Sequence, residues 1–129
     1  MRKFLYTHFP AILIALIILT LTSIPRLTPP DLGIKMQDKI FHTIAYFIFG
    51  MTLIHSGHFI FNRKIHILIY TVGIGLSFAA LDELHQVYIP GRMSSVYDFF
   101  ADGIGVILAL PLFLCWFRCI ILRYQLFFY

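Results

Sequence analysis

The stretch FPAILIALIILTLTSI, residues 9–24, contains no charged side chain. It approaches the length of a bilayer crossing, because a transmembrane helix needs roughly 20 mostly apolar residues to span about 30 Å of hydrocarbon. Three more apolar segments follow, separated by short gaps that force neighbouring helices to run antiparallel. The sequence therefore predicts an all-α integral membrane bundle of four transmembrane helices, over residues 9–24, 38–56, 65–83 and 97–122.

The composition of the whole chain agrees with this prediction. Of its 129 residues, 60% are hydrophobic and 12% are charged, whereas a soluble domain carries about a quarter charged residues. The length leaves no room for a separate soluble domain, so we expect residues 1–129 to form one membrane domain. The net charge of +4 is spread along the chain without a basic block, which favours a lipid bilayer rather than nucleic acid as the partner.

Lys and Arg residues near the ends of the spans predict the orientation, because these residues are more frequent in cytoplasmic loops. With both termini in the cytoplasm, more of the basic residues lie inside than outside. Those inside are Arg2, Lys3, Arg63, Lys64, Arg118 and Arg123, and those outside are Arg26, Lys35, Lys39 and Arg92. We therefore predict an N-in, C-in topology.

The acidic residues show a stronger asymmetry that does not depend on the orientation. All six lie in the first gap, at the start of the second span, at the end of the third, or at the start of the fourth: Asp31, Asp38, Asp82, Glu83, Asp98 and Asp102. Four antiparallel helices bring these positions to one membrane face. In the N-in topology this face is extracellular.

The second span begins with a polar face. Asp38, His42 and Tyr46 recur every four residues, so they line one side of a helix and descend into the bilayer. Asp38 is also explained by the preference for acids at a helix N-terminus, and Tyr46 by a packing role. His42 has neither explanation, and ionisable groups inside spans usually mark functional sites.

The third span ends on Asp82 and Glu83, with Gln86 on the same face. Acids at a helix C-terminus are disfavoured by up to about 1 kcal/mol each, because the helix dipole is negative there. Something must offset this cost. The candidates are Arg92, Lys39, a protonated His42 or His85, and a bound cation, and we expect Arg92 to be the main partner.

Ser95, just before the fourth span, and Asp98, in its first turn, resemble a helix-capping pair. Asp102 lies one turn deeper, beyond the reach of capping, so its carboxylate is a stronger candidate for a site. The face of Asp102 continues as Gly105 and Ala109, and the face of Asp82 carries the small residues Thr71, Gly75 and Ala79 upstream. Small residues indicate close helix packing, although those beyond Asp102 would also leave room for a ligand.

These motifs resemble those of the VanZ-like membrane proteins. The matching pieces are DKIFHTIAYFIFG (38–50), LDELHQVYIPGR (81–92) and SSVYDFFADGIG (94–105), within a core of about residues 38–110. The chain departs from the family pattern mainly at Asp102, where Asn is frequent. The resemblance implies a small multi-pass protein of the cell membrane and cell envelope. The family is named for a protein that gives low-level resistance to the glycopeptide antibiotic teicoplanin, and the resemblance implies no particular reaction.

The candidate polar site consists of Asp38, Lys39, His42, Tyr46, Asp82, Glu83, Gln86, Arg92, Asp98 and Asp102. We expect it to bind an amphiphilic or lipid-linked molecule, with Arg92 and Lys39 facing an anionic headgroup. A metal-assisted membrane enzyme is an alternative, with a divalent cation held by some of His42, Asp82, Glu83, Asp98 and Asp102. A structural or partner-binding module and an ion transporter are further alternatives, the transporter being less favoured because no span is broken at mid-depth.

Overall fold

The computed structural model describes the backbone of residues 2–27, 33 and 35–127, and the side chains of residues 6–27, 33 and 35–113. This part of the chain forms four helices: α1 (Arg2–Ser23), α2 (Gln37–Ile60), α3 (Lys64–Gln86) and α4 (Val96–Phe127). Each helix contains a segment long and apolar enough to cross a membrane. The predicted all-α bundle of four spanning helices is thereby confirmed.

The helices extend beyond the apolar segments from which they were predicted. Helix α3, for example, continues to Gln86, so Asp82 and Glu83 lie inside its last two turns. The backbone hydrogen bonds of a helix do not require apolar side chains, and a helix of 22 to 24 residues is about 33–36 Å long. Helices α1, α2 and α3 are therefore slightly longer than the hydrocarbon core is thick, and α4, with 32 residues, is longer still.

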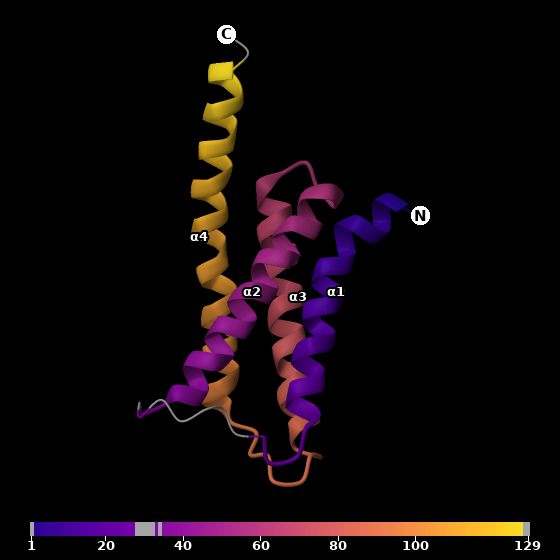
Figure 1. The fold of residues 1–129 in the computed structure, drawn as a ribbon, viewed down its shortest axis with the longest axis vertical. Coiled ribbons are helices and arrows are strands. Elements are labelled where there is room, and N and C mark those ends of the chain that lie inside the picture. The colour runs from indigo at the N-terminus through magenta and orange to yellow at the C-terminus, as the bar shows by residue number, and fades with distance from the viewer. Residues whose placement is uncertain (1, 28–32, 34, 128–129) are drawn as a thin grey trace.

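Successive helices run in opposite directions (Figure 1). The two termini and the α2–α3 turn lie at one end of the bundle, and the α1–α2 and α3–α4 connections lie at the other. Helix α2 runs obliquely and packs against all three other helices. This arrangement brings the start of α2, the end of α3 and the start of α4 to the same end.

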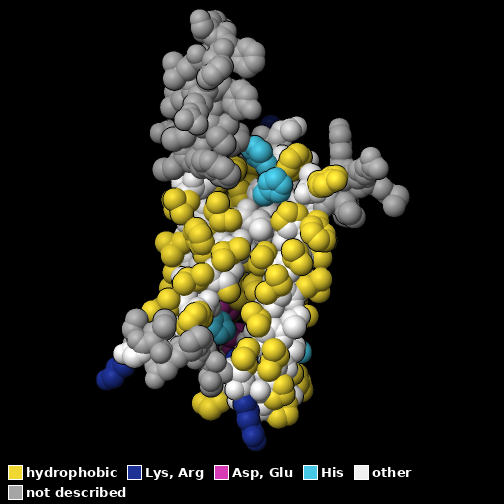
Figure 2. All heavy atoms as spheres, viewed as in Figure 1, with side chains coloured by type: hydrophobic (Ala, Val, Ile, Leu, Met, Phe, Trp, Pro, Cys, Tyr) yellow, Lys and Arg dark blue, Asp and Glu magenta, His cyan; other side chains and the backbone are white. Residues whose placement is uncertain are grey.

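The outer surface of the bundle is apolar. Large hydrophobic side chains such as Ile44, Ile69 and Ile107 are at least half exposed, and hydrophobic side chains cover most of the face shown in Figure 2. Lys and Arg side chains project from the lower end of this face, and Arg63 and Lys64 lie at the opposite end of the bundle, where α3 begins. An apolar belt of this kind, bounded by charges, is the surface expected of a helix bundle in a lipid bilayer.

Small residues allow the helices to approach closely, as predicted. A Cβ atom on Gly105 would meet the backbone of α2 at Thr43 and Phe47, and a Cβ atom on Gly75 would lie 2.8 Å from the side chain of Val106. Ala79 and Ala109 are fully buried. Below Asp102, the small residues of α4 therefore serve close packing against α2 rather than leaving room for a ligand.

Candidate functional site

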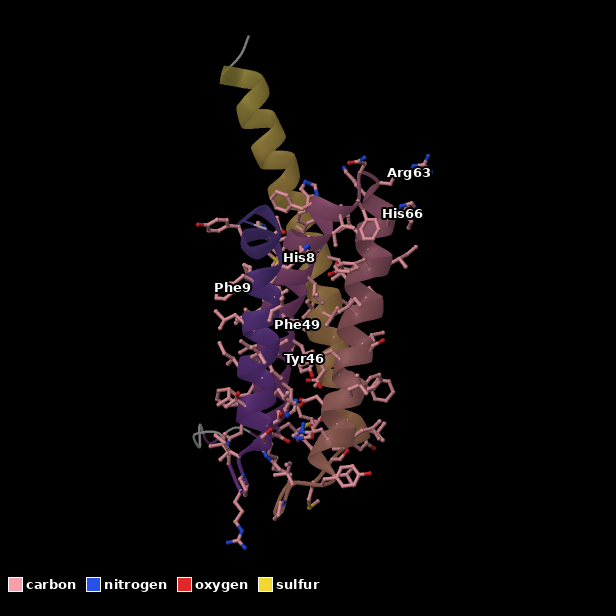
Figure 3. The ribbon with its side chains drawn as sticks, turned by 90° about the vertical axis from the view of Figure 1, so that its right-hand side faces the viewer. His8, Phe9, Tyr46, Phe49, Arg63 and His66 are labelled. Atoms are coloured by element: carbon pink, nitrogen blue, oxygen red, sulfur yellow. The ribbon has the colours of Figure 1, made fainter. Side chains whose placement is uncertain are left out.

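Buried polar side chains gather at the end of the bundle where α2 begins, α3 ends and α4 begins. The exposed fractions are 2% for Asp82, 6% for Glu83, 2% for Gln86, 8% for Asp98 and 0% for Asp102. Figure 3 shows nitrogen and oxygen atoms concentrated below Tyr46, between the helices. Five of the six acids are thus found at one end, as predicted, and Asp31 lies outside the described residues.

His42 and Asp102 meet between α2 and α4. Nδ1 of His42 lies 2.9 Å from Oδ1 of Asp102, and the side chain of Asp102 is completely buried. Among the residues that the structure describes, none donates a hydrogen bond to Oδ2 of Asp102. A buried carboxylate oxygen without a donor is unfavourable, at roughly 1–3 kcal/mol or more. Oδ2 of Asp102 therefore lacks the partner that a buried oxygen normally has.

Asp82 accepts hydrogen bonds from three helices. Thr22 of α1 donates to Oδ1 at 2.7 Å, and Tyr46 of α2 donates to Oδ2 at 3.4 Å. Gln86, one turn further along α3, donates to Oδ2 at 3.3 Å. These donors stabilise the carboxylate at the C-terminal end of α3, where the dipole of its own helix does not.

Glu83 is stabilised by the start of α4. Its Oε2 atom accepts hydrogen bonds from the hydroxyl of Ser94 at 3.0 Å and from the backbone N–H of Ser95 at 2.9 Å. Since α4 begins at Val96, this carboxylate lies at a helix N-terminus, where the dipole favours negative charge. The negative charge of Glu83 is therefore destabilised by the dipole of α3 and stabilised by the dipole of α4.

Lys39 joins the starts of α2 and α4. Its ammonium group lies 2.7 Å from Asp38 and 2.5 Å from Asp98. The predicted capping pair is only half formed, because Ser95 Oγ accepts from the N–H of Tyr97 while the N–H of Ser95 donates to Glu83. Asp98 is thus a partner of Lys39 rather than a reciprocal cap.

The prediction that Arg92 pairs with Asp82 and Glu83 is wrong. Within the described part of the chain, Arg92 forms no ion pair with either acid, and its Nη2 atom donates to the carbonyl oxygen of Leu21 at 2.7 Å. The last carbonyls of a helix lack intrahelical partners and carry partial negative charge. The guanidinium therefore caps the C-terminus of α1, while hydroxyl and amide groups stabilise the acids.

A cavity of about 460 Å³ lies between α1 and α2 at this end of the bundle. Its polar lining includes Asp38, His42, Asp82 and Arg92, and its apolar lining includes Ile18, Leu21, Ile44 and Ile48. Leu21, Ile44 and Ile48 are also exposed on the outer surface, so the cavity borders the lipid-facing side. Figure 2 shows a histidine and acidic side chains recessed between hydrophobic ones near the lower end.

The candidate metal ligands divide into two groups. Donor atoms of His42, Glu83 and Asp102 all lie within 4.8 Å of one another. Asp82 and Asp98 are not part of this trio, since Asp82 accepts from Thr22, Tyr46 and Gln86 and Asp98 pairs with Lys39.

Sequence reasoning missed the contributions of Thr22 and Ser94. Thr22 is buried and brings α1 into the site through Asp82, although α1 was expected to be only a span. The cluster of Thr20, Thr22 and Ser23 at the end of that span was the available signal. It is weak, because Thr and Ser in membrane helices commonly bond to their own backbone, as Thr20 and Ser23 do here.

Comparison with known proteins identifies the family. No curated protein and no solved structure matches the chain at a significant level. A family model described as VanZ/LLP1 matches residues 5–118, which include α1 as well as the motifs at residues 38–105. The match confirms the resemblance read from those motifs. This multi-pass membrane protein belongs to the VanZ/LLP1 family.

Proposed function

We propose that this protein binds the headgroup of an amphiphilic or lipid-linked molecule in the α1–α2 cavity, and that this binding contributes to low-level resistance to the glycopeptide teicoplanin. The observation that carries the proposal is the two-sided lining of the cavity. Charged and polar groups form one part, and side chains that continue onto the lipid-facing surface form another. A headgroup with an attached acyl chain matches both parts.

The side chain of Arg92 is the reason to expect a negatively charged group in this headgroup. Its Nε atom is buried and, among the described residues, has no hydrogen-bond partner, although the side chain lines the cavity. A guanidinium with a donor to spare binds phosphate or carboxylate oxygens well. Asp38 and Asp82 line the same cavity, and their oxygens are acceptors for hydroxyl or amine groups of a ligand.

This chemistry fits two sources of ligand. Lipid-linked wall precursors carry phosphates and sugars on a long lipid, and teicoplanin carries an acyl chain on a polar body. Both combine polar groups with an apolar chain that remains in the bilayer. The shared ligand class is therefore a polar, partly anionic headgroup on a hydrocarbon chain.

Binding is tested with an acyl-diazirine phospholipid as the probe, added to purified protein in nanodiscs. We expect photolabelling of the cavity wall at Ile44 and Ile48. Arg92→Gln removes one charge-assisted interaction, which should weaken binding by about tenfold or more. Arg63→Gln is the matched control, because Arg63 lies at the other end of the bundle (Figure 3). Equal labelling of Ile74, on the outer surface of α3, would indicate bulk lipid contact and contradict the proposal.

The resistance phenotype is tested in a susceptible bacterial host. The wild-type protein should raise the inhibitory concentration of teicoplanin, and Arg92→Gln and Asp82→Asn should reduce this effect at equal membrane levels. Unlabelled teicoplanin and a lipid-linked wall precursor, added as competitors in the photolabelling assay, distinguish the two ligand sources. Full resistance in both variants would separate the phenotype from the cavity.

A further inference from the structure

We propose that His42, Glu83 and Asp102 bind a divalent transition-metal ion where α2, α3 and α4 meet. One donor atom from each side chain lies within 4.8 Å of the other two. The three residues come from three helices, so the helix packing, rather than a flexible loop, determines their separation. This inference stands apart from the proposed function, because it concerns a position beside the α1–α2 cavity and does not require a ligand there.

The unpartnered oxygen of Asp102 is an independent indication of a ligand. The side chain is 0% exposed, Oδ1 faces His42, and Oδ2 has no donor among the described residues. Buried polar atoms almost always have a partner, and this position is too enclosed for bulk water to supply one. A cation bound to the carboxylate would satisfy it.

The charges around the cluster also favour a cation. Asp82, Glu83 and Asp102 are all at most 6% exposed, yet the ion pairs within the described part of the chain give none of them a Lys or Arg partner. Lys39 is already shared by Asp38 and Asp98. Hydrogen bonds stabilise Asp82 and both oxygens of Glu83 but do not neutralise their charge, so the three carboxylates together carry more negative charge than a single histidine can balance. Among the described residues, His42 is the basic side chain that pairs with one of these three acids.

The donor set indicates which metal binds. One imidazole nitrogen with two carboxylates suits Zn²⁺ or Mn²⁺, whereas Mg²⁺ and Ca²⁺ prefer oxygen ligands alone. Zinc bonds of about 2.0–2.2 Å place tetrahedral donor atoms roughly 3.3–3.6 Å apart. Nδ1 of His42 and Oδ1 of Asp102, at 2.9 Å, would move slightly apart, and any pair of donors near the 4.8 Å limit would move closer together. Side-chain rotations provide both adjustments.

Three protein ligands would leave one position open, as in catalytic zinc sites. His42 also lines the α1–α2 cavity, so the open position would lie near the proposed headgroup. That last step rests on the proposed function. The binding of the metal itself does not.

Metal binding is tested on the purified full-length protein in nanodiscs, without added amphiphile. After chelator treatment, Zn²⁺, Mn²⁺ and Mg²⁺ are titrated by calorimetry, and bound metal is measured by mass spectrometry. We expect about one Zn²⁺ or Mn²⁺ per chain and no competition by Mg²⁺. His42→Gln, Glu83→Gln and Asp102→Asn should each weaken binding by about a hundredfold or more, since even groups that only support metal ligands contribute 10- to 100-fold.

Asp98→Asn is the matched control, because it removes the same charge at the same end of the bundle but leaves the trio intact. It should change the affinity by no more than about threefold. Loss of the metal in Asp98→Asn to the same degree would indicate non-specific attraction to acids, and unchanged binding in His42→Gln would place the metal elsewhere. Either result, or no binding by the wild type, overturns the proposal. Arg92→Gln should keep the metal while its photolabelling at Ile44 and Ile48 is reduced, which separates this proposal from the previous one.

Discussion

Asp82 and Glu83 are neighbours in sequence, but their carboxylates are held by different helices. Successive residues of a helix differ by about 100° in direction, so Asp82 reaches Thr22 of α1 and Tyr46 of α2, while Glu83 reaches Ser95 at the start of α4. The pair therefore connects α3 to each of the other helices. Two adjacent acids that look badly placed in a single helix are well placed in the bundle.

Among the described glycines, Gly105 makes the closest approach to the backbone of a neighbouring helix. A Cβ atom there would meet the backbone of Thr43 and Phe47, and would lie 3.1 Å from Cβ of Tyr46. Backbone atoms cannot rotate away, so Gly105→Ala should push α2 and α4 apart. We expect a loss of about 1–3 kcal/mol, measured as a lower unfolding temperature in detergent.

Gly73→Ala provides the control for this substitution. Gly73 lies inside α3, and an added Cβ would have no atom within 4 Å. Replacing Gly by Ala in a helix then stabilises it by up to about 1 kcal/mol, because Ala has the better helix propensity. If both variants unfolded at the wild-type temperature, close packing at Gly105 would not limit the stability of the bundle.

At the scale of helices, α4 is capped by a side chain from α3. Removal of the carboxylate in Glu83→Ala would leave the N–H of Ser95 and the hydroxyl of Ser94 without their acceptor. Loss of such a cap costs about 0.5–2 kcal/mol, and the effect should be local. Hydrogen exchange in the first turn of α4 should therefore become about twofold to thirtyfold faster in metal-free protein.

Asp38→Ala is the comparison for this exchange measurement. Its carboxylate pairs with Lys39 but is 49% exposed on the side chain, and exposed ion pairs contribute at most about 1 kcal/mol. Exchange at the start of α4 should stay close to the wild-type rate. Unchanged exchange in Glu83→Ala would show that Ser95 caps the helix without help from α3.

The helices and their arrangement could be predicted from the sequence, but the partners of individual side chains could not. The four helices follow from apolar length, and the common position of Asp38, Asp82 and Asp102 follows from antiparallel connections. The partners of individual groups do not follow, because they depend on helix rotation and tilt. Arg92 reaches Leu21 rather than Asp82. Thr22 contacts Asp82 from α1, although no ionisable residue in the predicted first span indicated that this helix contributes to the site.

At the scale of the whole molecule, the two ends of the bundle differ in character. The five described acids lie at the end with the α1–α2 and α3–α4 connections, whereas Arg63 and His66 lie at the other end (Figure 3). The loop between α3 and α4 is accessible, with Met93 at 88% exposure. The distribution of basic residues predicts that this loop faces the outside, and the prediction can be tested directly.

Single cysteines report the orientation when the two native ones, Cys115 and Cys119, are replaced by serine. Met93→Cys should react with a membrane-impermeant maleimide in intact cells, and Asn62→Cys, exposed in the α2–α3 turn, should react only after permeabilisation. The reverse pattern would place the acidic end in the cytoplasm. A glycopeptide is too large and polar to diffuse across a bilayer, so a cytoplasmic site could not meet teicoplanin directly. Headgroup binding from the inner leaflet would then stand, and the proposed link to resistance would fail.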